Sequence, residues 1–276
     1  MEKVICFGAA GGGKRLFNEI SERYEIIAFT DNDKNKIGKT INGITIYSVD
    51  ECLKMDWDVI VITSAPGLVN IKKQLTSMGI DSRKIDTSFI ELPLLSRISF
   101  LEKLSKIQNF ENAAVAEVGV FEGDFAKWIN QFYDKQRLHL FDTFEGFDKR
   151  DIEKESSYSK AEIGEYANTS VDMVMGKMPY PENVIIHKGY FPDTANGLKD
   201  SFVFVNLDVD LYEPTYKGLM FFKDKMIKGG VILVHDYFAT NFQGPHEAVN
   251  QFVEEMNGQY AIYPIGDGIS IMITGF

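Results

Sequence analysis

The stretch Ala113–Gly123, AAVAEVGVFEG, decides the fold of the larger part of this chain. Its apolar residues predict a buried strand over 113–119, and the glycines that follow permit a tight turn and a close approach of the backbone to a ligand. The segment 124–133 has apolar residues at helical spacing and predicts a helix with Asp124 as its N-cap. The stretch therefore indicates a strand, a ligand-binding turn and a helix, although glycines used only for packing remain an alternative.

A second strand, LHLFD, ends in Asp142 about 20 residues further on. In dinucleotide sites an acid at this place binds ribose hydroxyls, and a surface acid is the alternative. Five further segments predict strands: 183–189, 202–210, 230–236 and a closing pair, YAIYPI and GISIMIT, joined by GDG. Strands that alternate with helices indicate a parallel α/β sheet, and the last pair predicts an antiparallel hairpin.

This acidic glycine turn, the acid after the second strand and the final hairpin resemble a class I methyltransferase that uses S-adenosylmethionine. The resemblance implies a mostly parallel seven-stranded sheet. It also implies a cofactor without phosphate, whose positive sulfonium and amino groups favour acidic surroundings. The cofactor-binding residues that it suggests are Glu117, Gly119, Gly123, Asp142, Thr143 and Gly189.

The segment NLDVDLYEPT holds the most specific chemistry of the chain. Asp208 and Asp210 lie two residues apart, so on an extended strand they point to the same face. The strand 230–236 ends with His235 and Asp236, and on a neighbouring strand these side chains would meet the first pair. Close carboxylates repel one another unless a proton or a cation intervenes, which favours Mg²⁺, or Mn²⁺ if the imidazole joins. Some of these acids could instead cap loops or hold the cofactor amine.

Six segments in order resemble the macrocin O-methyltransferase family, which methylates sugar hydroxyls with the help of a metal: EVGVFEGDFA, LFDTFEGF, HKGYFPDT, NLDVDLYEPTY, GGVILVHDY and GPHEAVNQF. The resemblance covers about residues 110–276 and implies metal ligands at Asp210, His235 and Asp236. Asp208 or His235 would take the acceptor proton, and Tyr212 and His246 are candidate substrate contacts. The usual Asp-Asp pair of the family is His-Asp here, which favours Mn²⁺ over Mg²⁺ and leaves metal dependence open.

The first 95 residues form a separate α/β unit that opens with the glycine cluster FGAAGGGKRL. It nearly matches a P-loop, but Arg15 replaces the Ser or Thr that would hold magnesium. The small Rossmann-like domains of bacterial sugar-modifying enzymes are similar to this unit. Its candidate nucleotide site consists of Gly8, Gly11, Gly13 and Asp31. The unit either holds the nucleotide part of a nucleotide-linked sugar or serves packing and dimer contacts, and a working NAD site is the remaining alternative.

The fold class predicted from the sequence is thus α/β, with two Rossmann-like units in series at 1–95 and 96–276. The second unit starts with a connector helix that places Leu95, Ile98, Leu101 and Leu104 on one face. The polar region 149–180 has no strong period and is either a mobile lid or a surface insertion.

Bulk composition restricts the function classes. The net charge is −11 and the sequence pI about 4.9, which argues against a nucleic-acid surface. No apolar run approaches the ~18 residues of a membrane span, and the N-terminus lacks a signal-peptide layout. Cys6 and Cys52 fit buried free thiols. We therefore expect a cytoplasmic homo-oligomer that methylates a sugar, polyol or nucleotide-linked sugar; an NAD(P)-dependent oxidoreductase and a non-catalytic binding module are the alternatives.

Overall fold

The computed structural model describes residues 1–276 except 66, 109–111, 156–160, 162 and 240–241. Its chain divides into two compact units, Met1–Leu95 and Ser96–Phe276. Each unit contains one sheet in which most neighbouring strands pair parallel.

The N-terminal unit has a six-stranded sheet in the order β3-β4-β2-β1-β5-β6, in which only β3 and β4 pair antiparallel. Its strands are β1 (Lys3–Phe7), β2 (Glu25–Thr30), β3 (Thr40–Ile41), β4 (Ile44–Tyr47), β5 (Val59–Ile62) and β6 (Ile85–Asp86). Its helices are α1 (Gly11–Arg15), α2 (Phe17–Arg23), α3 (Val49–Cys52) and α4 (Leu68–Ser77), with short 3₁₀ turns η1 (Lys34–Lys36) and η2 (Ser82–Lys84).

The C-terminal unit has a seven-stranded sheet in the order β12-β13-β11-β10-β7-β8-β9. Its strands are β7 (Ala114–Val118), β8 (Leu138–Asp142), β9 (Val184–Lys188), β10 (Phe202–Leu207), β11 (Met226–Val234), β12 (Ala261–Pro264) and β13 (Ile271–Thr274). The first five pair parallel, whereas β13 pairs antiparallel with β11 and β12. The predicted fold class, with a closing antiparallel hairpin, is confirmed.

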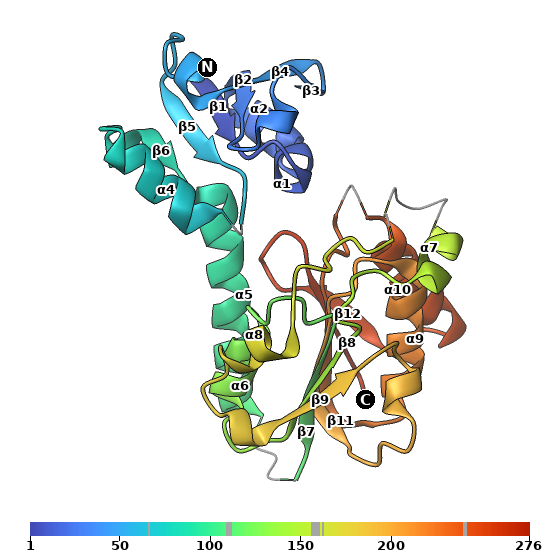
Figure 1. Cartoon of the computed structure of the whole chain (residues 1–276). Helices are drawn as coiled ribbons and strands as arrows, with labels where there is room; N and C mark the ends of the chain where they lie inside the picture. Colours follow the sequence, from blue (N-terminus) through green and yellow to red (C-terminus); the bar gives the residue numbers. More distant parts are fainter. Residues whose placement is uncertain (66, 109–111, 156–160, 162, 240–241) are drawn as a thin grey trace. The chain divides into compact units, whose positions relative to one another are not determined.

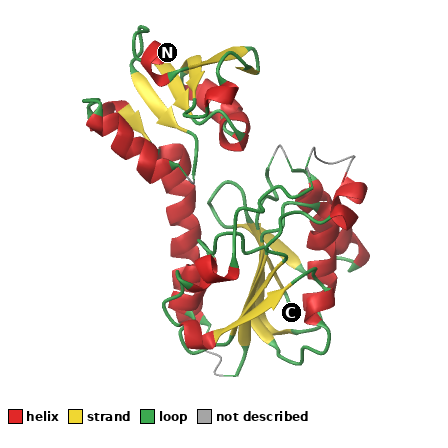
Figure 2. Ribbon diagram, viewed as in Figure 1, coloured by secondary structure: helices red, strands yellow, loops and turns green. Residues whose placement is uncertain are grey.

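Helices cover both faces of this second sheet, as Figures 1 and 2 show. On one face lie α6 (Ala126–Phe132), α8 (Val171–Met175) and the second half of α5 (Ser88–Ile107). On the other face lie α9 (Tyr212–Phe222) and α10 (Gly244–Glu255), with α7 (Lys149–Glu155) packed against α9. The 3₁₀ turns η3 (Pro181–Asn183) and η4 (Asp193–Ala195) flank β9. Two buried apolar clusters, one on each face, fix the sheet between these layers.

Helix α5 differs from the prediction at one position. Phe89 and Ile90 belong to the core of the N-terminal unit and Leu101 to that of the C-terminal unit. Leu95, expected on the buried face, is 59% exposed, whereas Arg97 is only 8% exposed. The prediction for Leu95 is wrong because the apolar spacing could not show that the half-buried carboxylate of Asp208 compensates the charge of Arg97, which takes the buried place two residues later.

The structure also bears on three other predictions, which concern the cap of α6, the region 149–180 and the two cysteines. The prediction that Asp124 caps α6 is wrong: the cap residue is Phe125, and Asp124 instead pairs with Lys127 and Lys177. The region 149–180 contains α7 and α8, while its residues 156–160 and 162 lie outside the described part. Both cysteines are buried and free, as predicted.

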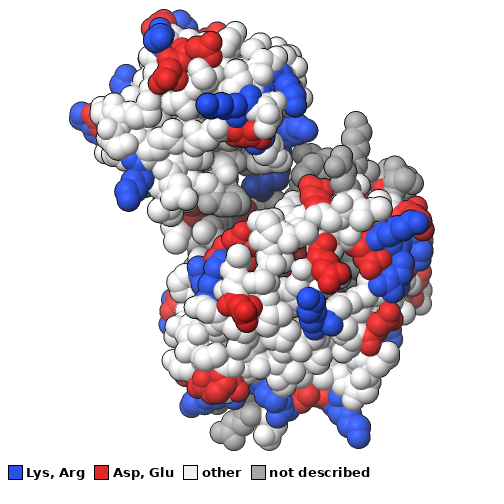
Figure 3. Space-filling model, viewed as in Figure 1, with Lys and Arg blue, Asp and Glu red and all other residues white. Residues whose placement is uncertain are grey.

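The surface of the C-terminal unit carries charges of both signs. On the face in view, Lys and Arg side chains lie interspersed with Asp and Glu side chains (Figure 3). The C-terminal unit also forms ion pairs, among them Lys177 with Asp124 and Arg150 with Asp148. Among the described residues, none of the helices combines the length and the apolar character that crossing a bilayer requires.

Candidate active site

The carboxyl ends of the parallel strands in the C-terminal unit carry most of the backbone strain in the described chain. Phe121, Phe144, Asp210 and Asp236 each follow one of the strands β7, β8, β10 and β11, and each has a positive φ between 48° and 59°. This conformation is costly for residues other than glycine and persists where the surroundings impose it, often at functional sites. Strain at the ends of four strands of one sheet therefore marks this edge as the site.

The glycine turn after β7 is held by Asp142. One carboxylate oxygen accepts hydrogen bonds from the amides of Val120 (2.7 Å) and Phe121 (2.9 Å), and the other accepts one from Phe144 (2.7 Å). A carboxylate has about four acceptor positions, so one remains for a ligand hydroxyl. Asp142 thus shapes the turn, a role that the sequence analysis did not foresee.

Gly119 has no room for a side chain. Its φ is +81°, and a Cβ would lie 1.9 Å from the backbone oxygen of Asp208. Gly123 also has a positive φ, of +78°. The amide of Gly189 donates to the backbone oxygen of Asp142, and the Thr143 hydroxyl donates to the backbone oxygen of Gly146. These predicted cofactor residues therefore lie on the three adjacent strand ends of β7, β8 and β9.

A polar ladder, formed by the side chains of Glu117, Asn206, Arg97 and Asp208, starts on β7 and crosses to β10. The register pairs Glu117 with Asn206, and the Asn206 amide donates to Glu117 Oε1 at 2.7 Å. Arg97 Nη2 donates to Asn206 Oδ1 (3.0 Å) and to Asp208 Oδ2 (2.9 Å). Burial raises the pKa of Glu117 well above its usual value, and the charge of Asp208 adds to this effect.

His235 lies between two carboxylates. Because β10 and β11 pair Leu207 with Val234, the next residues, Asp208 and His235, stand side by side. His235 Nδ1 lies 2.6 Å from Asp236 Oδ2 and 3.2 Å from Asp208 Oδ1. Burial and Arg97 oppose its protonation, but the two carboxylates outweigh them and raise the pKa of His235 to about 10. The imidazole is therefore cationic in this arrangement.

The three acids of the cluster differ in ionisation. Burial disfavours the charged form of each, but His235 and Arg97 lower the pKa of Asp208, and His235 lowers that of Asp236. Burial and the charges of Asp236 and Asp208 raise the pKa of Asp210 well above its usual value. The hydrogen bond between Asp210 and Asp236 also favours the neutral form of Asp210.

A metal ion would find its ligands at Asp208, His235 and Asp236, whose ligand atoms all lie within 4.8 Å of one another. The sequence analysis named Asp210 with His235 and Asp236. The structure instead brings Asp208 into this group and places Asp210 beside it. One imidazole nitrogen and two carboxylates form a donor set that suits Mn²⁺ or Mg²⁺.

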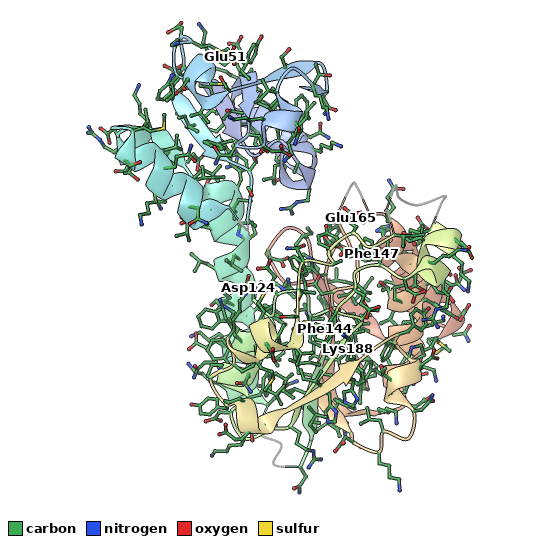
Figure 4. All side chains as sticks on the ribbon, in the orientation of Figure 1. Glu51, Asp124, Phe144, Phe147, Glu165 and Lys188 are labelled. Atoms are coloured by element: carbon green, nitrogen blue, oxygen red, sulfur yellow. The ribbon has the colours of Figure 1, made fainter. Side chains whose placement is uncertain are left out.

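Aromatic side chains form one wall beside these acids. Phe121 and Phe147 both contact Tyr166 edge-to-face, with ring centroids 5.3 Å apart, and Phe147 also contacts Phe242. Figure 4 shows Phe147 near Glu165, whose backbone oxygen accepts from the Phe147 amide. Burial raises the pKa of Tyr166, and the charge of Asp210 raises it further. Tyr166 is therefore close to the acid cluster, and the sequence analysis missed it.

The two predicted substrate residues lie on helices α9 and α10. Tyr212 begins α9; its amide donates to Glu155 at 2.7 Å and its hydroxyl contacts Gln251. His246 lies in the first turn of α10, with its ring 4.6 Å from that of Tyr237. These contacts join α9 to α7 and α10, and α10 to the loop after β11, and a substrate role for both residues stays a prediction.

The candidate site of the N-terminal unit is largely occupied by its own chain. Asp31 accepts from the Ala9 amide (2.8 Å), the Asp33 amide (2.9 Å) and Lys36 (2.9 Å). A Cβ on Gly8 or Gly13 would strike neighbouring atoms at 2.8 and 2.4 Å, so close packing explains these glycines, while the space around Gly11 is open. Asp31 thus holds its glycine turn much as Asp142 holds the second one.

Arg97 and Asn206 are the main functional residues that sequence reasoning missed. A signal for each was present, since Arg97 interrupts an apolar helix face and Asn206 an apolar strand. Pairing them required the tertiary structure, because they lie 109 positions apart.

Comparison with known proteins agrees with this geometry. The family model described as macrocin-O-methyltransferase (TylF) matches residues 101–268. The chain belongs to the macrocin O-methyltransferase family. It is therefore a methyltransferase, and the macrocin O-methyltransferase match covers every residue of the acid cluster and the glycine turn. Residues 1–86 match a second model, described as C2185-like, N-terminal.

Solved structures support the fold. The O-methyltransferase NovP is 18% identical and superposes with a TM-score of 0.53, covering 65% of this chain and 79% of its own. The calicheamicin methyltransferase CalS11 is 16% identical, with a TM-score of 0.54 over 76% of this chain and 85% of its own. At such identities the likeness concerns the methyltransferase fold alone. No curated protein sequence matches the chain.

Proposed function

We propose that this protein is an S-adenosylmethionine-dependent O-methyltransferase that acts on a hydroxyl of a sugar, a nucleotide-linked sugar or a similar polyol. The observation that carries the proposal is the cluster of Asp208, His235 and Asp236 at the strand ends next to the Gly119 turn. Adjacent hydroxyls are the groups that such a cluster can bind, directly or through a divalent cation.

The residues around the turn fit the cofactor. Glu117 Oε2 is buried without a hydrogen-bond partner, and Asp142 retains one acceptor position, so both can serve a hydroxyl or an amine. The cofactor carries no phosphate, and the turn that would hold it is acidic. S-adenosylmethionine would supply an activated methyl group, and Glu117, Gly119, Gly123, Asp142, Thr143 and Gly189 would bind it.

The chain itself must align the acceptor oxygen and receive its proton. Alignment for in-line displacement supplies much of the rate, about 7–11 kcal/mol at best. Asp208 is the ionised candidate for the proton, since a cationic His235 cannot accept one. His235 could act as the base only in its neutral form, and because a neutral imidazole has one acceptor nitrogen, a cation held by that nitrogen would remove this role.

We also propose a divalent cation at Asp208, His235 and Asp236. Bound there, Mg²⁺ or Mn²⁺ would chelate adjacent hydroxyls and lower the pKa of the acceptor. The positive φ of Asp210 and of Asp236 supports a cluster shaped for a ligand, because this conformation is costly for residues other than glycine and persists mainly at functional sites.

Calorimetry with S-adenosylmethionine and S-adenosylhomocysteine tests the cofactor. Methyl transfer from labelled cofactor to a panel of sugars and nucleotide-linked sugars, with chelator and then with Mg²⁺ or Mn²⁺ added, tests the acceptor and the metal. Asp208→Asn should abolish the response to metal, whereas the surface variant Asp224→Asn should retain it. Absence of binding by both cofactor forms would end the proposal, and full activity in chelator would remove its metal part.

An NAD(P)-dependent oxidoreductase has less support, because Asp31 already binds Ala9, Asp33 and Lys36. The N-terminal unit is proposed to serve as an accessory module, for a nucleotide-linked sugar or for contact between copies of the chain. Size-exclusion chromatography with light scattering checks the expected homo-oligomer. A non-catalytic module would bind the cofactor yet methylate none of the panel.

A further inference from the structure

Arg97 is a buried cation on a helix that is otherwise packed by apolar residues. It lies within α5 and is 8% exposed. Its guanidinium carbon stands 3.9 Å above the centre of the Phe125 ring. Burying an arginine costs several kcal/mol unless charges and hydrogen bonds compensate it. The groups that compensate Arg97 therefore indicate why an arginine occupies this position.

The compensation comes from residues of the site. One nitrogen, Nη2, donates to both Asn206 and Asp208, while Asp208 turns its other oxygen to His235 Nδ1 at 3.2 Å. Arg97 therefore occupies Oδ2 of Asp208 and leaves Oδ1 as the oxygen that faces the imidazole. The hydrogen bond from Arg97 thus fixes the rotation of the Asp208 carboxylate.

The polar ladder is not the arrangement that would give the folded protein the greatest stability. Arg97 Nε and Glu117 Oε2 are both buried without a hydrogen-bond partner. Each such atom carries a desolvation cost, and a buried ionic network with unpaired atoms is generally less stable than apolar side chains of the same shape. A role in arranging the site explains why this network exists.

We propose that Arg97 is a positioning residue of the methyltransferase site, which acts through Asp208 on His235. It sets which Asp208 oxygen faces His235 and thereby fixes the imidazole that meets the acceptor or a cation. The link to catalysis rests on the proposed function, but the positioning itself does not.

Long-range ¹H–¹⁵N correlation spectra of the histidine rings test the positioning, because the chain has only four histidines. Arg97→Met should shift the ring signals of His235 and leave those of His139 unchanged. Arg97→Lys, which keeps the charge, should shift them less. The matched control is Arg137→Met: Arg137 pairs with Asp200, which lies 3.5 Å from His139, so this variant should affect His139 and spare His235.

A double variant tests the route through Asp208. Asp208→Asn should shift His235 by itself, and adding Arg97→Met to it should produce no further shift. Unchanged His235 signals in Arg97→Met, or a full additional shift in the double variant, would overturn the proposal. If Arg97→Met does not fold, Arg97→Lys and its double variant with Asp208→Asn decide by the same comparison.

Calorimetry separates this proposal from the proposed function. Arg97→Met should bind S-adenosylhomocysteine as the wild type does, because Arg97 acts on the acceptor side of the site. Weaker binding by about tenfold or more, the loss expected for a hydrogen bond to a charged group, would make Arg97 a cofactor contact and overturn the positioning role. Failure of the wild type to bind S-adenosylhomocysteine would refute the cofactor proposal. The positioning role of Arg97 would then be tested by the histidine spectra alone.

Discussion

Replacing Gly119 with alanine should destabilise the C-terminal unit and displace the acid cluster. The added Cβ would lie 1.9 Å from the backbone oxygen of Asp208 and 2.7 Å from its carbonyl carbon, where ordinary contact begins at 3.4 Å. Both partners are backbone atoms, so no rotamer change can relieve the overlap. The turn after β7 or the segment after β10 must move.

Gly197→Ala is a matched control. Gly197 has the same φ of +81°, but a Cβ added there would meet nothing within 4 Å. The control should cost about 1 kcal/mol, since strain of about 1–2 kcal/mol is partly offset by the lower entropy of the unfolded chain. Gly119→Ala adds overpacking of about 1–3 kcal/mol, so its total should reach about 2–4 kcal/mol.

The assay is urea unfolding followed by fluorescence in a Trp57→Phe background. The chain has two tryptophans, and Trp128 alone then reports on the C-terminal unit. Calorimetry of both variants with S-adenosylhomocysteine adds a functional readout, which only Gly119→Ala should weaken. Equal losses of unfolding free energy for the two variants would refute the reasoning, because the contact with Asp208 would then contribute nothing.

Three other predictions concern the acid that holds the turn, a buried acid and the domain division. Asp142→Ala should weaken S-adenosylhomocysteine binding by about 10- to 100-fold, because three backbone amides lose their acceptor. Calorimetry measures this affinity, and an unchanged affinity would contradict the prediction. Burial raises the pKa of Glu155 from 4.5 to about 7, so the folded state binds this proton more tightly and stability is lost as the pH rises between these values, by about 3 kcal/mol at most. Urea unfolding at pH 5 and pH 8 should show a smaller change in unfolding free energy for Glu155→Gln than for the exposed control Glu153→Gln. Equal changes in the two variants would contradict the prediction for Glu155. A chain that begins at Ser88 retains all of α5 and should fold and bind S-adenosylhomocysteine; a folded chain without binding would assign part of the cofactor site to the N-terminal unit.

Much of the architecture was predictable from local patterns. Apolar runs of strand length, separated by helical spacing, indicated the parallel sheet, and the GDG segment indicated the antiparallel hairpin that β12 and β13 form. Asp124 and Leu95 were exceptions. A residue becomes a cap, or is buried, according to what its neighbours in space offer, and the sequence window around it does not contain those neighbours.

The site was predictable in its residue types and less so in their roles. Asp208, Asp210, His235 and Asp236 were expected to converge because strand ends in a parallel sheet share an edge, and the structure brings them together. Which acid stands beside His235 depends on the register of β10 and β11, which pairs Leu207 with Val234. A shift of two residues would have placed Asp210 beside His235 and kept every side chain on its face, so alternation along the strand alone could not decide between Asp208 and Asp210.

By itself the sequence determined the strand, turn and helix order, the two glycine turns and the acids that end the strands, because these depend on residues close along the chain. Only the tertiary structure decided how the charges are balanced. Arg97 reaches Asp208 across 111 positions, Asp142 and Asp31 bind the backbone of their own turns, and the charges of Asp236 and Asp208 raise the pKa of Asp210. Ionisation in a buried site depends on distances and desolvation between groups that are remote in sequence, and those quantities exist only once the chain has folded.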